Sequence, residues 1–229
     1  MRNILIIDTE TTGLEPEAGA EIIEIAGVLF NVEYKEILQQ GSTFLKVNNN
    51  PQYSVNKINS EVTKVQFNQH IGLKFLEGMI NESDYLVAHN AEFDKNFCVK
   101  SMYPELEKCE TMKWIDTYDF DWPEPLPNGK SLVNVALSMG VPVLSAHRAL
   151  TDCLLIASCF QKIENLQGRL INALTERFVY KALVSFDDKQ LAKDAGFVWD
   201  RFVPRSWGKR LTENEAAEIK HFKIVKIED

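Results

Sequence analysis

The stretch "ILIIDTETTGL" (Ile4–Leu14) decides the fold, because it joins an apolar strand directly to two acidic side chains. Ile4–Ile7 is an uninterrupted apolar run, typical of a strand that is covered on both faces. Side chains alternate along a strand, so Asp8 and Glu10 point to the same face, roughly 6–7 Å apart. Two like charges at the end of a buried strand repel each other and lose hydration. The pair therefore requires something that compensates its charge.

Strand and helix patterns alternate on either side of this stretch. We expect an antiparallel meander of strands at 3–8, 21–32 and 36–47, and a further short strand at 85–90. Apolar spacing predicts helices over 63–81, 91–104, 131–140 and 147–167, with a strand or turn at 111–120 and a loop at 122–130. This order predicts an α/β fold with a central mixed sheet and helices on its faces.

Length and composition bound the class of protein. The 229 residues suit one substantial domain and a small second one. The apolar runs are too short for a membrane span, and the N-terminus lacks the pattern of a secretory signal, so we expect a cytoplasmic protein with no membrane partner. The four cysteines lack zinc-finger spacing and a disulfide pattern, and we expect free thiols.

The charge balance differs between the two ends of the chain. Residues 1–177 carry a net charge of −9 and residues 178–229 a net charge of +1. We therefore predict a domain over 1–170 and a small α+β domain over 178–229, with the boundary between 165 and 178. The tail pattern predicts a strand at 180–186, a helix at 187–199, a strand or turn at 205–211, a helix at 212–222 and a strand at 223–227.

Two further motifs carry acidic residues. "VAHNAEFD" (87–94) places Asp94 just inside a helix, and "AHRALTDC" (146–153) places His147 five residues before Asp152. Each alone fits a helix cap or a solvated helix face. Together with Asp8 and Glu10 they supply four carboxylates, enough to hold two divalent cations that clamp a phosphodiester. His147 could accept the proton of an attacking water.

These motifs resemble a known family. "IIDTETTGL", "VAHNAEFD" and "HRALTDC" are similar to the three motifs of the DEDDh (DnaQ-like) superfamily of 3′–5′ exonucleases, and "CETMKW" (109–114) adds similarity to its exonuclease X branch. The resemblance spans about residues 3–165 and implies an RNase H-like five-stranded sheet. It implies two metal ions, Mg²⁺ or Mn²⁺ in its place. The implied roles are metal ligation by Asp8, Glu10, Asp94 and Asp152, general-base catalysis by His147, and substrate contacts by Thr11, Leu14 and Asn90.

The implied function is metal-dependent hydrolysis at a nucleic-acid 3′ end, releasing nucleoside monophosphates. DNA is favoured, as in repair by exonuclease X-like enzymes, and the alternatives are RNA 3′-end trimming, a polymerase proofreading subunit or a non-catalytic end-binding module. A complete set of five catalytic positions argues against the last. One departure is Asn59 in "VNKINSEVT" (55–63), where many relatives carry histidine, so substrate contacts from that loop are in doubt.

The tail stretch "KDAGFVWDRFVPRSWGKRL" (193–211) resembles a small domain of unknown function. Its basic residues Arg201, Arg205, Lys209 and Arg210 alternate with aromatic ones, as contacts to phosphates and bases require. The same tryptophans would also serve as the core of a small domain. We expect Trp199 and Trp207 to be core residues and leave the role of the basic cluster open, between nucleic-acid contact, partner contact and solvation.

Overall fold

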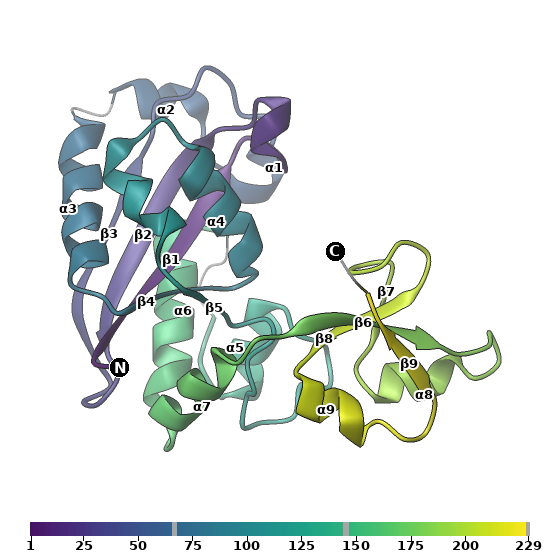
Figure 1. Cartoon of the computed structure of the whole chain (residues 1–229). Coiled ribbons are helices and arrows are strands. Elements are labelled where there is room, and N and C mark those ends of the chain that lie inside the picture. Colours follow the sequence, from purple (N-terminus) through teal and green to yellow (C-terminus); the bar gives the residue numbers. More distant parts are fainter. Residues whose placement is uncertain (66–67, 144–146, 228–229) are drawn as a thin grey trace. The chain divides into compact units, whose positions relative to one another are not determined.

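The computed structural model describes residues 1–65, 68–143 and 147–227, and the chain divides into two compact units, Met1–Ala173 and Leu174–Asp229 (Figure 1). The first unit is built on a five-stranded sheet with the strand order β3-β2-β1-β4-β5. Strands β1 (Asn3–Thr11), β2 (Ile22–Asn31) and β3 (Glu36–Phe44) form the predicted antiparallel meander. Strands β4 (Tyr85–Ala88) and β5 (Trp114–Asp116) join it in parallel, which confirms the mixed sheet.

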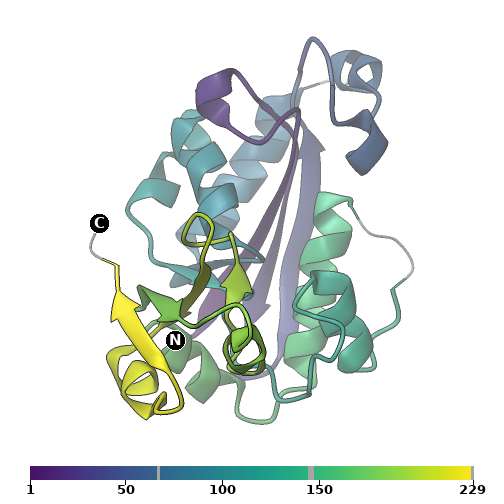
Figure 2. The same ribbon diagram turned by 90° about the vertical axis from the view of Figure 1, so that its right-hand side faces the viewer.

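Helices cover both faces of this sheet. Helices α3 (Gln69–Asn81) and α4 (Ala91–Lys100) lie on one face and α6 (Ala149–Gln161) on the other, as Figure 2 shows. The remaining elements are η1 (Pro16–Ala18), α1 (Tyr53–Asn56), α2 (Ser60–Val65), η2 (Pro104–Glu110), α5 (Leu132–Ser138) and α7 (Leu166–Ala173). Within the described ranges, no helix is both long enough and apolar enough to cross a membrane.

The alternation of β1 decides which side chains reach which face. Leu5 and Ile7 are buried in the cluster formed with Leu73 and Leu76 of α3 and with α4. The even-numbered residues therefore point to the opposite face, toward α6. Asp8 and Glu10 continue that even-numbered series where the apolar run stops, so the sheet carries both carboxylates to the α6 side.

Two helices predicted in the first unit extend past the end of a helix in the structure. The helix expected over 63–81 is two helices, because the Asn68 side chain accepts a hydrogen bond from the His70 N–H and begins α3 anew. Residues 66 and 67 of that span lie outside the described residues. The helix expected over 147–167 ends at Gln161, and the chain turns at Lys162 to bury Ile163 before α7 begins. The helical spacing of apolar residues continues across this turn, so the sequence pattern does not indicate where α6 ends.

The second unit contains a four-stranded sheet with the order β7-β8-β6-β9. Its elements are β6 (Phe178–Leu183), α8 (Lys189–Asp194), β7 (Val198–Trp199), β8 (Trp207–Leu211), α9 (Glu213–Glu218) and β9 (Lys223–Lys226). Its core includes Tyr180, Ala192 and Phe197. The small α+β fold is confirmed. The helix predicted over 187–199 is too long, because Gly196 adopts φ +78 and ends it, so Trp199 lies in a strand.

Candidate active site

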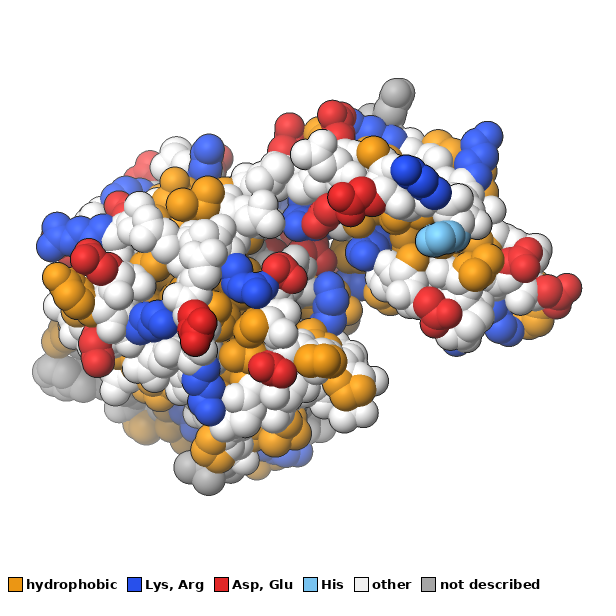
Figure 3. Space-filling model, turned by 90° about the horizontal axis from the view of Figure 1, so that it is seen from below, with side chains coloured by type: hydrophobic (Ala, Val, Ile, Leu, Met, Phe, Trp, Pro, Cys, Tyr) orange, Lys and Arg blue, Asp and Glu red, His pale blue; other side chains and the backbone are white. Residues whose placement is uncertain are grey.

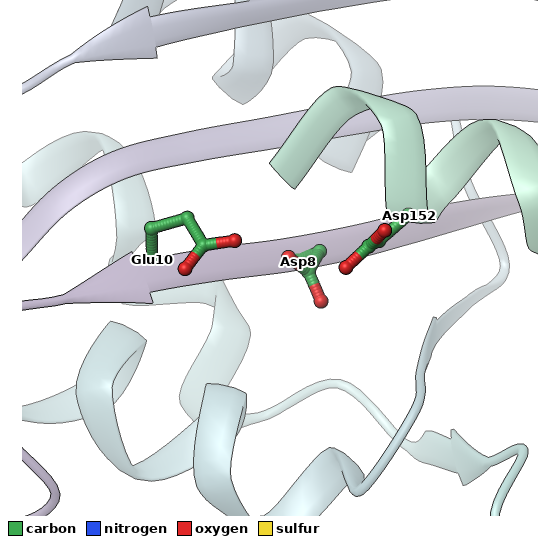
Figure 4. Close-up of side chains that lie close together, drawn as sticks. All are labelled: Asp8, Glu10 and Asp152. Carbon is green, nitrogen blue, oxygen red and sulfur yellow. The ribbon is translucent and has the colours of Figure 1, made fainter. Parts of the chain in front are cut away.

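Three acidic side chains from two elements meet at the end of β1. Asp8, Glu10 and Asp152 each place one carboxylate oxygen so that these atoms all lie within 4.8 Å of one another. Figure 4 shows the three carboxylates turned toward a common space, with Asp8 between the other two. Strand β1 supplies two of them through its alternation, and the first turn of α6 supplies the third. The structure thus brings together three of the four predicted ligands.

The fourth predicted ligand, Asp94, approaches β1 from the α4 side. Its Oδ1 accepts hydrogen bonds from the Thr9 backbone N–H at 2.9 Å and from the Thr9 hydroxyl at 2.7 Å. Thr9 lies between Asp8 and Glu10 in sequence and so points to the opposite face of the strand. Asp94 is only 2% exposed and is fixed beside Asp8, although it is not a member of the group of three.

An ion pair between a buried glutamate and a partly exposed arginine, which the sequence pattern did not predict, borders the group. Glu24 of β2 lies directly opposite Glu10 in the strand register and is 1% exposed. The guanidinium of Arg148 binds both of its carboxylate oxygens at 2.9 Å, and the Ala149 N–H donates to Oε2 at 3.3 Å. The single acidic residue within the apolar strand "IIEIAGVLF" was a signal for such a site. Glu24 therefore fastens the start of α6 to the sheet.

His147 is exposed and immediately precedes Arg148, the N-cap residue of α6. Its backbone adopts φ +62, in the left-handed region that residues other than glycine rarely occupy. Such a conformation is costly and is found at sites where the surrounding structure imposes it. Burial raises the pKa of the Asp152 carboxyl, and both the His147 side chain and the His147 backbone N–H oppose this rise, so the histidine lies close to that carboxylate.

The site favours protonated carboxyl groups when no cation is present. Burial, followed by repulsion from Asp94, Asp152 and Glu10, raises the pKa of Asp8 well above its ordinary value. Burial and then repulsion from Asp152 and Glu24 raise the pKa of Glu10 to about 7. These shifts record negative charge that the protein's own cations do not balance.

The remaining two carboxyl groups behave alike. Burial raises the pKa of Asp94 to about 7, even though its hydrogen bonds from Thr9 oppose the shift. Burial raises the pKa of Asp152 to about 6, and His147 opposes that shift. Arg148 is already engaged by Glu24. A bound cation of higher charge would compensate these carboxylates.

The donors fit a hard divalent cation. The group offers carboxylate oxygens, which Mg²⁺ and Mn²⁺ prefer, and no sulfur ligand is part of it. The Oδ1 atom of Asp152 is buried and has no hydrogen-bond partner among the described residues. A buried carboxylate oxygen without a donor is costly unless a cation meets it. Asp8, Glu10 and Asp152 would hold the ion, with Asp94 beside them.

Three other predicted site residues lie at the end of β1, just after it and at the start of α4. The Thr11 hydroxyl donates to the Gly13 carbonyl at 2.6 Å, so it is engaged within its own loop. Leu14 is 74% exposed. Asn90 adopts φ +75 at the start of α4, and its N–H donates to Asp116 Oδ1 at 2.9 Å. A cavity of about 510 Å³ opens along α4, with Asn90 in its wall.

The loop that departs from the family pattern has a structural role. Asn59 is exposed, and its Oδ1 accepts from the Glu61 N–H at 3.0 Å, at the start of α2. Asn56 is buried, and its amide donates to the Thr11 carbonyl at 3.2 Å. This loop thus supports the end of β1 through Asn56.

The predicted basic residues of the tail differ in the groups that they contact. Arg201 and Arg210 lie over the Phe202 ring, with guanidinium carbons 5.2 and 5.5 Å from its centroid. Lys209 Nζ donates to the Ala195 carbonyl at 2.8 Å. Arg205 alone of the four lines a cavity that contains both tail tryptophans. On the face drawn in Figure 3, blue basic side chains are scattered among red acidic ones within the described residues.

The raised pKa values predict a pH-dependent stability that metal should reverse. In the unfolded chain these carboxyl groups titrate near pH 4, whereas Glu10 and Asp94 titrate at about 7 in the folded chain. Between about pH 4 and 7 the folded chain holds more protons, so its free energy of unfolding falls as pH rises through this window. We expect the metal-free protein to melt several degrees lower at about pH 8 than at about pH 5.

Calorimetry in chelator measures this difference directly. Addition of Mg²⁺ at the higher pH should restore the melting temperature, because the ion binds the ionised carboxylates of the folded state. A melting temperature that rises with pH in chelator, or that Mg²⁺ leaves unchanged, would contradict a cation site at these residues.

Comparison with known proteins identifies the family. A family model described as Exonuclease matches residues 5–160, and a second, described as Domain of unknown function (DUF8626), matches residues 178–227. Among curated proteins, none matches the sequence significantly. The second match confirms the resemblance of the tail to a domain whose function is unknown.

Solved structures share the fold. Exonuclease X in complex with 5′-overhanging duplex DNA is 24% identical, covers 75% of this chain and 99% of its own, and has a TM-score of 0.54. The nuclease domain of 3′hExo, a DEDDh family member bound to rAMP, is 20% identical over 74% of this chain and 94% of its own, with a TM-score of 0.54.

Escherichia coli Exonuclease I in complex with a dT13 oligonucleotide is 14% identical and has a TM-score of 0.58. The match covers 80% of this chain and only 49% of that protein. These similarities confirm the predicted RNase H-like fold, and the family match confirms the predicted enzyme class, a nuclease. With the Exonuclease model matching more than half of its length, the chain belongs to the exonuclease family.

Proposed function

We propose that this protein is a divalent-metal-dependent 3′–5′ exonuclease that releases nucleoside monophosphates from DNA 3′ ends. The observation that supports this most directly is the group of Asp8, Glu10 and Asp152, whose oxygens lie within 4.8 Å of one another and include the unpartnered Asp152 Oδ1. Asp94 and His147 complete the set that the family resemblance implies. An end-binding protein without catalysis would have no need for this full set.

The carboxylates and the histidine have different roles in hydrolysis of the phosphodiester. In the reaction a water oxygen bonds to phosphorus while the bond from phosphorus to the O3′ of the preceding nucleotide breaks. Two divalent ions, when bound, supply charge stabilisation for the attacking and leaving oxygens. Asp8, Glu10, Asp94 and Asp152 position those ions. His147 accepts the proton of the attacking water, a role suited to an imidazole, and the leaving oxygen takes its proton from solvent.

The terminal nucleotide is held by residues at the end of β1 and the start of α4. Leu14 is exposed beside the acidic group in sequence and can pack against the terminal base. The family resemblance assigns contacts with the 3′-terminal sugar to Thr11 and contacts near the scissile end to the polar side chain of Asn90. Hydrophobic contact with a base is independent of its identity, so we expect little sequence preference.

DNA is proposed as the substrate because of the similarity to exonuclease X, whose structure contains duplex DNA. The match covers 99% of the exonuclease X chain. A 3′-exonuclease that recognises a histone mRNA stem-loop is also similar, at 20% identity and over 65% of its length. Action on DNA 3′ ends would suit a role in DNA repair. Preference for RNA would require contacts to the 2′-hydroxyl.

Digestion of 5′-labelled oligonucleotides tests the proposal. DNA and RNA, single- and double-stranded, are incubated with Mg²⁺, Mn²⁺ or chelator. We expect a ladder that shortens from the 3′ end, mononucleotide products, faster loss of DNA than of RNA, and no cleavage in chelator. Shortening from the 5′ end, or cleavage that persists in chelator, would contradict the proposed polarity or metal dependence.

Replacing His147 should slow the chemical step without removing the metal. His147→Gln is expected to lower kcat by roughly 10²–10⁴-fold, because proton transfer to a positioned base contributes about that much. The shift in melting temperature on Mg²⁺ addition should persist, since the carboxylates remain. Single-turnover cleavage and calorimetry measure the two effects on one preparation.

His221→Gln is the matched control, since His221 is an exposed histidine of the second unit. It should cleave at the unmodified rate. Full activity in His147→Gln would remove the histidine from the mechanism, and a lost Mg²⁺ response would assign it to metal binding.

A further inference from the structure

The second unit contains a cavity whose lining is aromatic and basic. The cavity has a volume of about 410 Å³ and is formed by β6, the segment that follows it, β7 and β8. Its wall includes the aromatic residues Phe186, Trp199 and Trp207 and the basic residues Lys181, Lys189 and Arg205. All of these lie within Leu174–Asp229, so the cavity belongs to this unit alone.

Two of the aromatic side chains are more exposed than a folding role requires. Phe186 is 79% exposed and Trp199 is 52% exposed. The core of the unit is made by other residues, among them Tyr180 and Phe197. Trp207 does pack against that core, and its ring meets Trp199 in an edge contact with centroids 5.5 Å apart. The expectation that both tryptophans are core residues is therefore wrong for Trp199.

Cations accompany these rings. Lys189 Nζ lies 3.7 Å from the centroid of Phe186, a cation–π distance. Lys181 and Arg205 lie in the same wall, and the described lining includes no carboxylate. The nearby Asp188 carboxylate accepts a hydrogen bond from the Ser185 hydroxyl at 2.6 Å. Three positive charges around exposed rings form a surface that is complementary to an anion carrying flat apolar groups.

Arg205 is held at the cavity wall by a loop with an unfavourable backbone conformation. Asp200 and Arg205 both adopt positive φ, +57 and +51, in the loop that joins β7 to β8. The Arg205 N–H donates to Asp200 Oδ1 at 2.5 Å, and the Asp200 N–H donates to the Ser206 carbonyl at 2.9 Å. Left-handed conformations at two residues other than glycine are unfavourable, and such strain gathers at functional sites. The loop thus presents a preformed rim to a ligand.

We propose that this cavity binds single-stranded nucleic acid. Phe186 and Trp199 stack on unpaired bases, while Lys181, Lys189 and Arg205 contact the flanking phosphates. Aromatic stacking combined with a basic groove is the physical basis of sequence-tolerant single-strand binding. A polynucleotide is favoured over a peptide because a lining that is cationic and aromatic at once matches both components of a nucleotide. The choice of a strand over a free nucleotide rests on the proposed exonuclease function.

The proposed strand-binding site and the nuclease unit belong to the same chain. A strand held by the second unit remains at a high effective concentration for the nuclease unit of the same chain. The site therefore acts by retaining substrate, and it takes no part in bond cleavage.

Fluorescence anisotropy with a long labelled oligothymidylate tests the proposal on the full chain, in chelator so that no turnover occurs. Trp199→Ala is expected to weaken binding by about tenfold, the loss of one stacked base. Trp199→Phe keeps a stacking ring and should retain most of the affinity. Tyr34→Ala removes an exposed aromatic side chain from the first unit and should bind as the unmodified chain does.

Salt dependence tests the phosphate contacts. Lys189→Ala should reduce the slope of log affinity against log salt concentration by about 0.7, the value for one phosphate contact to a single strand. Lys220→Ala, an exposed lysine of the same unit outside the cavity wall, should leave the slope unchanged.

Normal affinity in both Trp199→Ala and Lys189→Ala would overturn the assignment, as would binding of thymidine monophosphate as tight as that of the strand. Hydrolysis of the p-nitrophenyl ester of thymidine 5′-monophosphate by the unmodified chain with Mg²⁺ tests the acidic group separately. Failure of that hydrolysis with intact strand binding would count against the proposed exonuclease and leave the single-strand site standing.

Discussion

Asp8→Asn is expected to abolish phosphodiester cleavage, with a loss of at least about 10³-fold in single-turnover rate at saturating Mg²⁺. Asp8 lies between Glu10 and Asp152 in the group of three, and Asp94 approaches it from the other side of the strand. An amide of the same shape carries no charge, so it weakens the hold on any ion shared across the group. Release of the terminal nucleotide from a 5′-labelled strand measures the effect.

The same variant should be more stable than the unmodified chain in chelator. Burial and then four neighbouring carboxylates raise the pKa of Asp8, so its charge is unfavourable in the folded state without a cation. A neutral side chain removes that repulsion, so the melting temperature in chelator at about pH 8 should rise. The additional stabilisation by Mg²⁺ should be lost.

Glu36→Gln is the matched control, because it removes one acidic charge from an exposed position on β3. It should keep full cleavage and the full Mg²⁺ response. Cleavage by Asp8→Asn at a normal rate, or a chelator melting temperature that falls, would remove Asp8 from the metal site.

Much of the site was predictable because it depends on local rules. The side-chain alternation of a strand places Asp8 and Glu10 together, and a helix that begins within "HRALTDC" presents Asp152 from its first turn. Antiparallel pairing of three successive strands also follows from their patterns. The same alternation places Thr9 on the opposite face, where its hydroxyl donates a hydrogen bond to Asp94.

Other features depend on contacts between distant segments or on single backbone conformations. The pair of Glu24 and Arg148 joins residues that lie 124 positions apart, and no local pattern specifies it. In the tail, Gly196 ends a helix whose apolar spacing continues past it, and this moves Trp199 from a helix into a strand. Exposure of Trp199 then follows from the tertiary fold rather than from composition.

Arg148→Ala should produce the largest loss of stability among single substitutions at the site. It leaves Glu24 without its cationic partner at 1% exposure, opposite Glu10 and near Asp152. Removing one partner of a buried pair costs about 3–5 kcal/mol, and the partial exposure of Arg148 reduces this to roughly 2–3 kcal/mol. Urea denaturation in chelator at neutral pH measures the change. Cleavage should fall as well, because the start of α6 loses two of its three hydrogen bonds to Glu24 of β2.

Glu24→Gln offers the comparison that separates charge from geometry. The glutamine removes one negative charge beside Asp8, Glu10 and Asp152. It leaves Arg148 in contact with solvent, since 44% of the Arg148 side chain is exposed. We therefore expect Glu24→Gln to cost much less stability than Arg148→Ala, and the double variant to recover most of what Arg148→Ala loses. If the pair acted only as a mechanical link, both single variants and the double variant would lose the same stability, because each breaks the same contact. Unequal single losses with recovery in the double variant would show instead that Arg148 neutralises a carboxylate which the active site cannot otherwise tolerate.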